Sequence, residues 1–155
     1  MAAAPDLEGL LRSKLFHDLA LEDVRRIGER GSTRTLEAGQ ALIEEGQTNT
    51  QLYVVVRGEL KIYLPPSQAR FTQVNLGKLG PGDCIGEYSF IDKRPASASV
   101  SAQQQTEVFQ IAQAEFERIL QSDPGVGKAV YKNLLHLLIA RLRRENQFLD
   151  FSHPS

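Results

Sequence analysis

The middle of the chain, residues 32–111, consists of short apolar segments separated by turn residues, and this pattern restricts the fold more than any other feature. Turn residues recur roughly every eight to twelve positions, a spacing typical of short antiparallel strands. Prolines in "LPPSQAR" interrupt one such run, because proline cannot continue a sheet ladder. The pattern predicts a β-barrel or double-sheet roll. Within it one strand should bury a single face, with Leu60, Ile62 and Leu64 alternating with Lys61 and Tyr63.

Helical spacing flanks this β segment on both sides. Apolar residues recur at three- and four-residue intervals from residue 5 to about 30, and again in "QAEFERILQS". Asp123 and Pro124 resemble an N-cap followed by proline at the first helical position, and they open a long helix to about Leu149. The predicted fold class is α+β: an antiparallel β-roll, jelly-roll-like, flanked by N-terminal helices and a long C-terminal helix.

The chain is expected to form one domain over residues 1–150, since 155 residues with 41% hydrophobic content suit a single core. We place the N-terminal helices at about 5–31, the β-roll at about 32–111, the C-terminal helices at about 113–149 and a tail at 151–155.

Charge and composition exclude several function classes. The chain has 18 Lys and Arg residues and 19 Asp and Glu residues, and its net charge is −1. It therefore carries no broad basic field that would bind nucleic acid. Too few residues follow the long helix for a DNA-reading module, so no DNA partner is expected. Cys84 is the single cysteine, which favours a reducing, cytoplasmic setting. The N-terminus lacks a signal-peptide pattern, and no 18-residue apolar run predicts membrane insertion.

The stretch "GDCIGEYSFIDKRPASASV", residues 82–100, is the candidate ligand site. Gly86 precedes "EYSFID", a segment long enough for a short helix, and the unpaired N–H groups at a helix start can bind a phosphate. Glu87 stands at that start, where a carboxylate can stabilise the helix dipole or accept hydrogen bonds from ribose hydroxyls. Taken alone, the Gly-Glu pair is more simply a turn and a cap.

The wider sequence resembles the cyclic nucleotide-binding domains of bacterial catabolite-type regulators, kinase regulatory subunits and gated ion channels. The likeness covers roughly residues 15–145 and rests on "LEAGQALIEEGQTNTQLYVVVRGELKIY", "LGPGDCIGEYSFIDKRPASASVSA" and "VFQIAQAEFERIL". It implies that Gly86 offers a backbone N–H to the cyclic phosphate, Glu87 binds the ribose 2′-hydroxyl and Ser97 offers a hydroxyl near the phosphate or base. The full expected site is Gly86, Glu87, Tyr88, Ala96, Ser97, Ala98 and Ser99.

One departure from the family pattern concerns the phosphate. The family places an arginine directly after the proline, but this chain has Ala96 there, and Ser97 in the variant with one extra residue. Arg94 or Lys93 could replace the missing cation, although "DKRP" is more simply a solvated turn; Arg57 and Lys78 are further candidates. For Ser97 and Ser99 the alternative to ligand binding is that they are strand residues whose hydroxyls form hydrogen bonds with neighbouring backbone groups.

The terminal helix carries an apolar stripe formed by Tyr131, Leu134, Leu135, Leu138, Leu142 and Leu149, with Arg141, Arg143, Arg144 and Glu145 placed on other faces. Its first half should cover the roll. In the family this helix closes over the pocket and in several members pairs with a twin. The sequence therefore predicts a protein partner or a homodimer through this helix; a lone helix packed on its own roll is the competing interpretation.

These features predict a cytoplasmic cyclic nucleotide-binding sensor. Its ligand is cyclic AMP or cyclic GMP, and Phe90 and Ile91 reposition the C-terminal helix to report occupancy to a partner. The alternative is a degenerate domain that no longer binds nucleotide and serves as a protein–protein interaction or assembly module. We expect no enzyme, because no catalytic constellation stands out, and no metal or cofactor.

Overall fold

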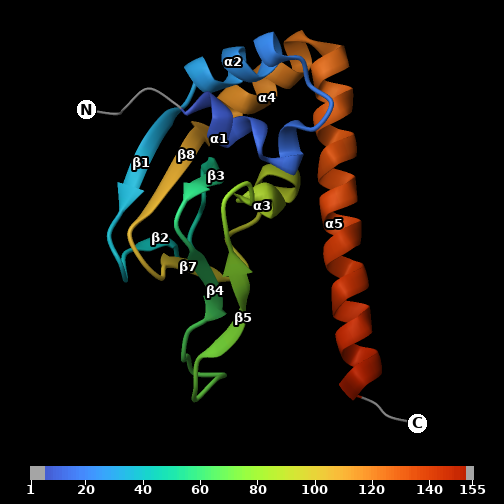
Figure 1. The fold of residues 1–155 in the computed structure, drawn as a ribbon. Helices are drawn as coiled ribbons and strands as arrows, with labels where there is room; N and C mark the ends of the chain where they lie inside the picture. The colour runs from blue at the N-terminus through green and yellow to red at the C-terminus, as the bar shows by residue number, and fades with distance from the viewer. Residues whose placement is uncertain (1–5, 153–155) are drawn as a thin grey trace.

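The computed structural model describes residues 6–152, and for residues 148–152 it describes the backbone alone. Eight strands form two four-stranded antiparallel sheets that close into a roll (Figure 1). One sheet has the order β1-β8-β3-β6 and the other β2-β7-β4-β5. The strands are β1 Ser32–Leu36, β2 Ala41–Ile43, β3 Gln51–Arg57, β4 Leu60–Leu64, β5 Val74–Leu79, β6 Cys84–Ile85, β7 Ser99–Ala102 and β8 Thr106–Ala112. The α+β roll predicted from the sequence is confirmed.

Helices lie before, within and after the roll. They are α1 Leu7–Leu11, the 3₁₀ helix η1 Lys14–Phe16, α2 Leu21–Glu29, α3 Glu87–Asp92, α4 Gln113–Ser122 and α5 Pro124–Ser152. Figure 1 shows α1, α2 and α4 gathered at one end of the roll, with α5 running along its side. The short helix α3 lies between the strands and α5. None of the helices in this part of the chain has both the length and the apolarity to cross a bilayer.

Two apolar clusters hold these layers together. The larger one joins the helices to the outer face of the sheet that contains β3 and β8, and it includes Phe90, Phe109, Phe116 and Leu134. The smaller one fills the interior of the roll and includes Val55, Ile85 and Val100, with Ala96 packed at its edge. The strand-to-helix segment from β6 to α3 contributes to both clusters, so the candidate site lies between the two cores.

The structure differs from the sequence prediction in strand β4. Leu60 is fully buried, but Ile62 and Leu64 are only half-buried, as are Lys61 and Tyr63. The predicted single buried face is therefore wrong for the outer part of the strand. The physical reason is that β5, the edge strand paired with β4, is exposed along most of its length. Figure 1 shows it extending away from α1, α2 and α4. The two-residue strand β6 pairs with β3 and is too short to be recognised from a sequence pattern.

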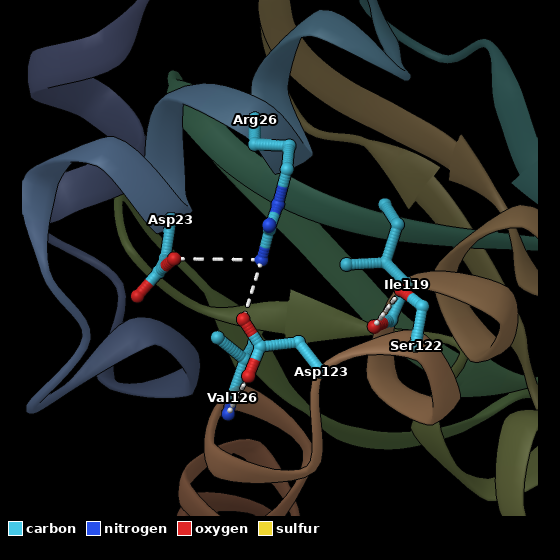
Figure 2. A network of polar contacts seen from close by, with 6 residues as sticks. All are labelled: Asp23, Arg26, Ile119, Ser122, Asp123 and Val126. Atoms are coloured by element: carbon cyan, nitrogen blue, oxygen red, sulfur yellow. Dashed lines mark hydrogen bonds and ion pairs between the residues drawn. The ribbon is translucent and has the colours of Figure 1, made fainter.

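The start of α5 is fixed by a polar network that joins it to α2 (Figure 2). Asp123 accepts a hydrogen bond from the Val126 N–H at 3.2 Å, which confirms the predicted N-cap. Its other carboxylate oxygen accepts from the Arg26 guanidinium at 3.0 Å, and Arg26 also contacts Asp23 at 3.4 Å. The hydrogen bond from Arg26 is the main cause that holds the pKa of Asp123 below its usual range.

We expect Asp123→Asn to lower the free energy of unfolding at pH 7 but to have little effect near about pH 2. Asparagine keeps the N-cap and removes only the charge. A carboxylate whose folded-state pKa is depressed stabilises the fold above its unfolded pKa of about 3.9, and this contribution disappears as the pH falls through the folded value. Urea denaturation of both proteins at the two pH values measures the difference. An equal difference at both values would contradict the prediction.

Candidate ligand site

The turn from β6 into α3 requires glycine at residue 86. Gly86 has φ +94°, and a Cβ atom built on it would lie 2.6 Å from the Gln51 carbonyl oxygen and 2.8 Å from Asn49 Nδ2. The Gln51 oxygen is itself held in place, because it accepts hydrogen bonds from Asn49 at 2.8 Å and from Gln113 Nε2 at 3.1 Å. A left-handed backbone and a close neighbouring strand together exclude other residues here.

Gly86→Ala should destabilise the protein by about 2 kcal/mol or more, since backbone strain of about 1–3 kcal/mol adds to the collision with Gln51. Gly39→Ala is the matched control, because Gly39 has φ +86° but no other atom lies within 4 Å of the position that a Cβ would take there. The control should show the backbone strain alone. Thermal or urea unfolding of the two variants measures both, and equal losses would show that the close approach at Gly86 does not matter.

Glu87 is buried at the first position of α3, with 5% of its surface exposed. Its Oε1 accepts a hydrogen bond from Nη1 of Arg141, on α5, at 2.8 Å. The same nitrogen donates to the Tyr88 hydroxyl at 2.7 Å, and the guanidinium lies 5.2 Å from the centre of the Tyr88 ring. The long helix is thus bonded to both of the first two residues of α3.

The Arg141 guanidinium carries a stable charge in this position. Burial acts to lower the pKa of Arg141, but the Glu87 carboxylate and the Tyr88 hydroxyl outweigh it, and the pKa is raised above its ordinary value. The pKa of the Cys84 thiol, just before the turn, is also raised, first by burial and then by the Glu87 charge. The thiol therefore stays protonated and unreactive at neutral pH.

Aromatic packing adds a second link between α3 and the C-terminal helices. The Phe90 ring lies 5.3 Å from the ring of Phe116 on α4 and is stacked at 6.3 Å on Tyr131 of α5. Ile91 does not share this position. Half of its surface is exposed, and its role in repositioning α5 stays a prediction.

The residues after the proline are hydrogen-bonded to the loop that follows β2. Ala96 is half-buried, its N–H donates to the Gln47 carbonyl at 2.9 Å, and its carbonyl accepts from the Gly46 N–H at 2.8 Å. Ser97 is exposed and Ala98 is half-buried. Ser99 is buried, and its hydroxyl oxygen accepts from the Glu45 N–H at 2.9 Å. The Ser99 hydroxyl therefore has a backbone partner, the Glu45 N–H, as the alternative interpretation of this serine predicts.

The cations considered as replacements for the missing arginine lie in other ion pairs or in solvent. Lys93 contacts Glu117 at 3.5 Å, and Lys78 contacts Glu59 at 3.4 Å. Arg57 binds both Asp6 and Glu107, while Arg94 is exposed. The cation that does reach Glu87 is Arg141, although helical spacing predicts it on a different face of α5 from the apolar residues. Only the path of α5 past α3 reveals this contact, because the two residues lie 54 positions apart.

A shallow hollow lies next to this region. Its volume is about 200 Å³, and it is lined by Leu42, Ile43, Glu44, Gln47, Thr48 and Asn49. Ligand sites in proteins usually measure roughly 300–1,000 Å³. The hollow is small and does not include Glu87, so support for a ligand comes from the geometry of Gly86 and Glu87 instead.

Comparison with known proteins identifies the family. Residues 33–123 match the profile of the family described as "Cyclic nucleotide-binding domain". The chain belongs to the cyclic nucleotide-binding domain family. The domains of this family are non-enzymatic sensors, so the resemblance read from the sequence is confirmed, and so is the expectation that this domain is not an enzyme.

Individual relatives of this cyclic nucleotide-binding domain agree in fold. A cyclic nucleotide-binding domain from Methylobacillus flagellatus superposes with a TM-score of 0.81 at 28% identity, over 96% of this chain and 83% of the other. The regulatory domain of Toxoplasma gondii PKA, solved with cAMP, gives a TM-score of 0.65 at 26% identity, over 73% of this chain and 42% of the other. The cyclic AMP receptor protein of Thermus thermophilus is 30% identical over 138 residues, which cover 89% of this chain and 61% of that protein.

Proposed function

We propose that this domain binds a cyclic nucleotide, cyclic AMP or cyclic GMP, at Gly86 and Glu87 and couples occupancy to the position of α5. The observation that carries the proposal is the contact between Glu87 and Arg141. Glu87 is the residue that the family resemblance assigns to the ribose, and in this structure it also binds the long helix. The Glu87 carboxylate therefore joins the candidate ligand site to α5, the helix that would report whether a ligand is bound.

The geometry of Glu87 allows both contacts at once. Its Oε1 binds Arg141, whereas its Oε2 makes no hydrogen bond to any residue in the described part of the chain. A ribose hydroxyl could donate to Oε2 while the guanidinium remains on Oε1. Bound ligand would then favour the arrangement of α5 that is compatible with both bonds, and such a switch needs only different affinities for two arrangements.

The names of the relatives support a cyclic nucleotide as the ligand class. The Thermus relative is a cyclic AMP receptor protein, and the Toxoplasma regulatory domain was solved with cAMP. Because this chain spans 61% of the first and 42% of the second, their complete activities and partners are not carried over.

The second candidate function is that of a protein-interaction domain, which keeps the fold but no longer binds a nucleotide. Ala96 favours it, because the residue after the proline supplies no charge and its backbone already bonds Gln47 and Gly46. Such a domain would act through protein contacts alone. The two candidate functions differ in whether Glu87 binds a ligand.

Isothermal titration calorimetry with cyclic AMP and with cyclic GMP tests the proposal. We expect binding by the unaltered protein and a loss of roughly tenfold or more in Glu87→Ala, since a hydrogen bond to a charged group contributes about 1.5–3 kcal/mol. Glu29→Ala, an exposed glutamate on α2, is the matched control and should bind normally. The absence of binding to both nucleotides at millimolar concentration would reject the proposal in favour of the degenerate domain.

A further inference from the structure

The loop between β4 and β5 carries an arginine that reaches the segment after the proline. Arg70 Nε donates to the Pro65 carbonyl at 3.2 Å, and Arg70 Nη2 donates to the Glu45 carboxylate. The backbone N–H of Glu45 is the donor to the Ser99 hydroxyl at 2.9 Å. The residue after Glu45 donates its N–H to the Ala96 carbonyl at 2.8 Å. Arg70 is therefore bonded to the loop that holds both ends of the segment from Ala96 to Ser99.

Strand pairing brings the end of β4 to the same segment. Tyr63 pairs with Ser99, and Pro65, which accepts the hydrogen bond from Arg70, directly follows β4. In an antiparallel pair the residues that follow Tyr63 run beside the residues that precede Ser99. Two separate connections, one through Pro65 and one through Glu45, thus hold the Arg70 guanidinium near the residues that the family resemblance assigns to the phosphate.

Burial sets this arginine apart from most others in the chain. The side chains of Arg70 and Arg141 are 26% and 29% exposed, whereas the other ion-paired arginines in the described residues are between 46% and 72% exposed. A shielded guanidinium loses hydration that fixed partners must replace. Arg141 has such a partner in Glu87, the expected ribose residue. The other shielded arginine lies on the phosphate side.

Arg70 keeps donors for a second anion. A guanidinium has five N–H donors in a planar fork, and the bonds to Pro65 and Glu45 use two of them. Its Nη1 donates to no residue in the part of the chain that the structure describes. The fork geometry matches two oxygens of a phosphate. The guanidinium can therefore hold Glu45 and a phosphate at the same time.

We infer that Arg70 supplies the positive charge for the phosphate of the cyclic nucleotide, in the place of the arginine that the chain lacks at Ala96. The inference rests on the proposed function and adds a residue to that same site. Glu45 neutralises part of this charge, so a direct cation at residue 96 would strengthen the site further.

The alternative role of the ion pair is only to fasten the β4–β5 loop to the loop after β2. The two roles predict different results for Glu45. If the pair is only a fastening, Glu45→Gln and Arg70→Gln break the same contact and should weaken nucleotide binding equally. If Arg70 binds the phosphate, Glu45→Gln releases the guanidinium from its competing carboxylate, and binding should be kept or strengthened.

Titration calorimetry with cyclic AMP distinguishes these roles. We expect Arg70→Gln to weaken binding by at least about tenfold, and Glu45→Gln to bind at least as tightly as the unaltered protein. Adding Ala96→Arg to the Arg70→Gln variant should restore binding. The matched control is Arg30→Gln, at an arginine paired with Glu115, which should bind normally. Equal weakening by Arg70→Gln and Glu45→Gln, or no weakening by Arg70→Gln, would overturn the inference and leave the proposed function standing.

Inorganic phosphate is the probe if neither cyclic nucleotide binds, which would reject the proposed function. In ¹⁵N NMR spectra, millimolar phosphate should then shift the Arg70 Nε–H signal and leave that of Arg30 unchanged. Sodium chloride at equal ionic strength should shift neither. A shift of the Arg70 signal would keep this arginine as an anion-binding residue in a domain without nucleotide. The absence of a shift would overturn the inference as well.

Discussion

Ala96→Arg should raise the affinity for cyclic AMP by about ten- to a hundredfold. The side chain of Ala96 packs at the edge of the roll interior, and its backbone is fixed on both sides by the loop after β2. A guanidinium introduced from this fixed position would meet the cyclic phosphate that the family site places there. A charge-assisted hydrogen bond of this kind contributes about 1.5–3 kcal/mol, which is one to two decades in affinity.

Titration calorimetry of the variant alongside the unaltered protein measures this gain. Ala41→Arg is the control, since Ala41 is an exposed alanine at the start of β2 and lies outside the expected site. Binding that appears only in Ala96→Arg would mean that the pocket persists in a domain that no longer uses nucleotide. An unchanged affinity in a variant that melts normally would show that residue 96 does not face the phosphate.

Phe116→Ala should lower the free energy of unfolding by about 3–5 kcal/mol, the usual range for removing a buried aromatic ring. Phe116 is completely buried on α4 and belongs to the cluster that joins the helices to the roll. Its ring supports Phe90, which in turn stacks on Tyr131 of α5. A domain of this size is stabilised by only about 5–15 kcal/mol, so the substitution removes a large share of its stability.

Urea unfolding monitored by circular dichroism measures the loss. Phe71→Ala is the same substitution at a side chain that is 97% exposed, and it should stay within about 0.5 kcal/mol of the unaltered protein. If Phe116→Ala does not fold, Phe116→Leu keeps most of the volume and should lose about 1–2 kcal/mol. A loss below about 1 kcal/mol in Phe116→Ala would contradict the burial of this ring.

Local sequence patterns determined the fold class and predicted the centre of the candidate site. Turn residues at regular spacing predicted the β-roll over residues 32–111, whereas the strand Cys84–Ile85 is too short to show any periodicity. The boundaries of α3 and α4 agree with "EYSFID" and "QAEFERILQS", because glycine, proline and capping residues act within a few positions along the chain. The position of Glu87 at a helix start, following Gly86, was readable for the same reason.

Tertiary structure alone decided which charges and rings meet. Whether Arg141 faces Glu87 depends on the path of α5 past α3, and helical spacing within α5 carries no information about that path. Likewise, periodicity grouped Leu134 with Leu135, although packing buries the first and exposes the second. Sequence patterns report interactions between neighbours in the chain, whereas the bond between Glu87 and Arg141 joins side chains 54 residues apart that only the closed fold brings together.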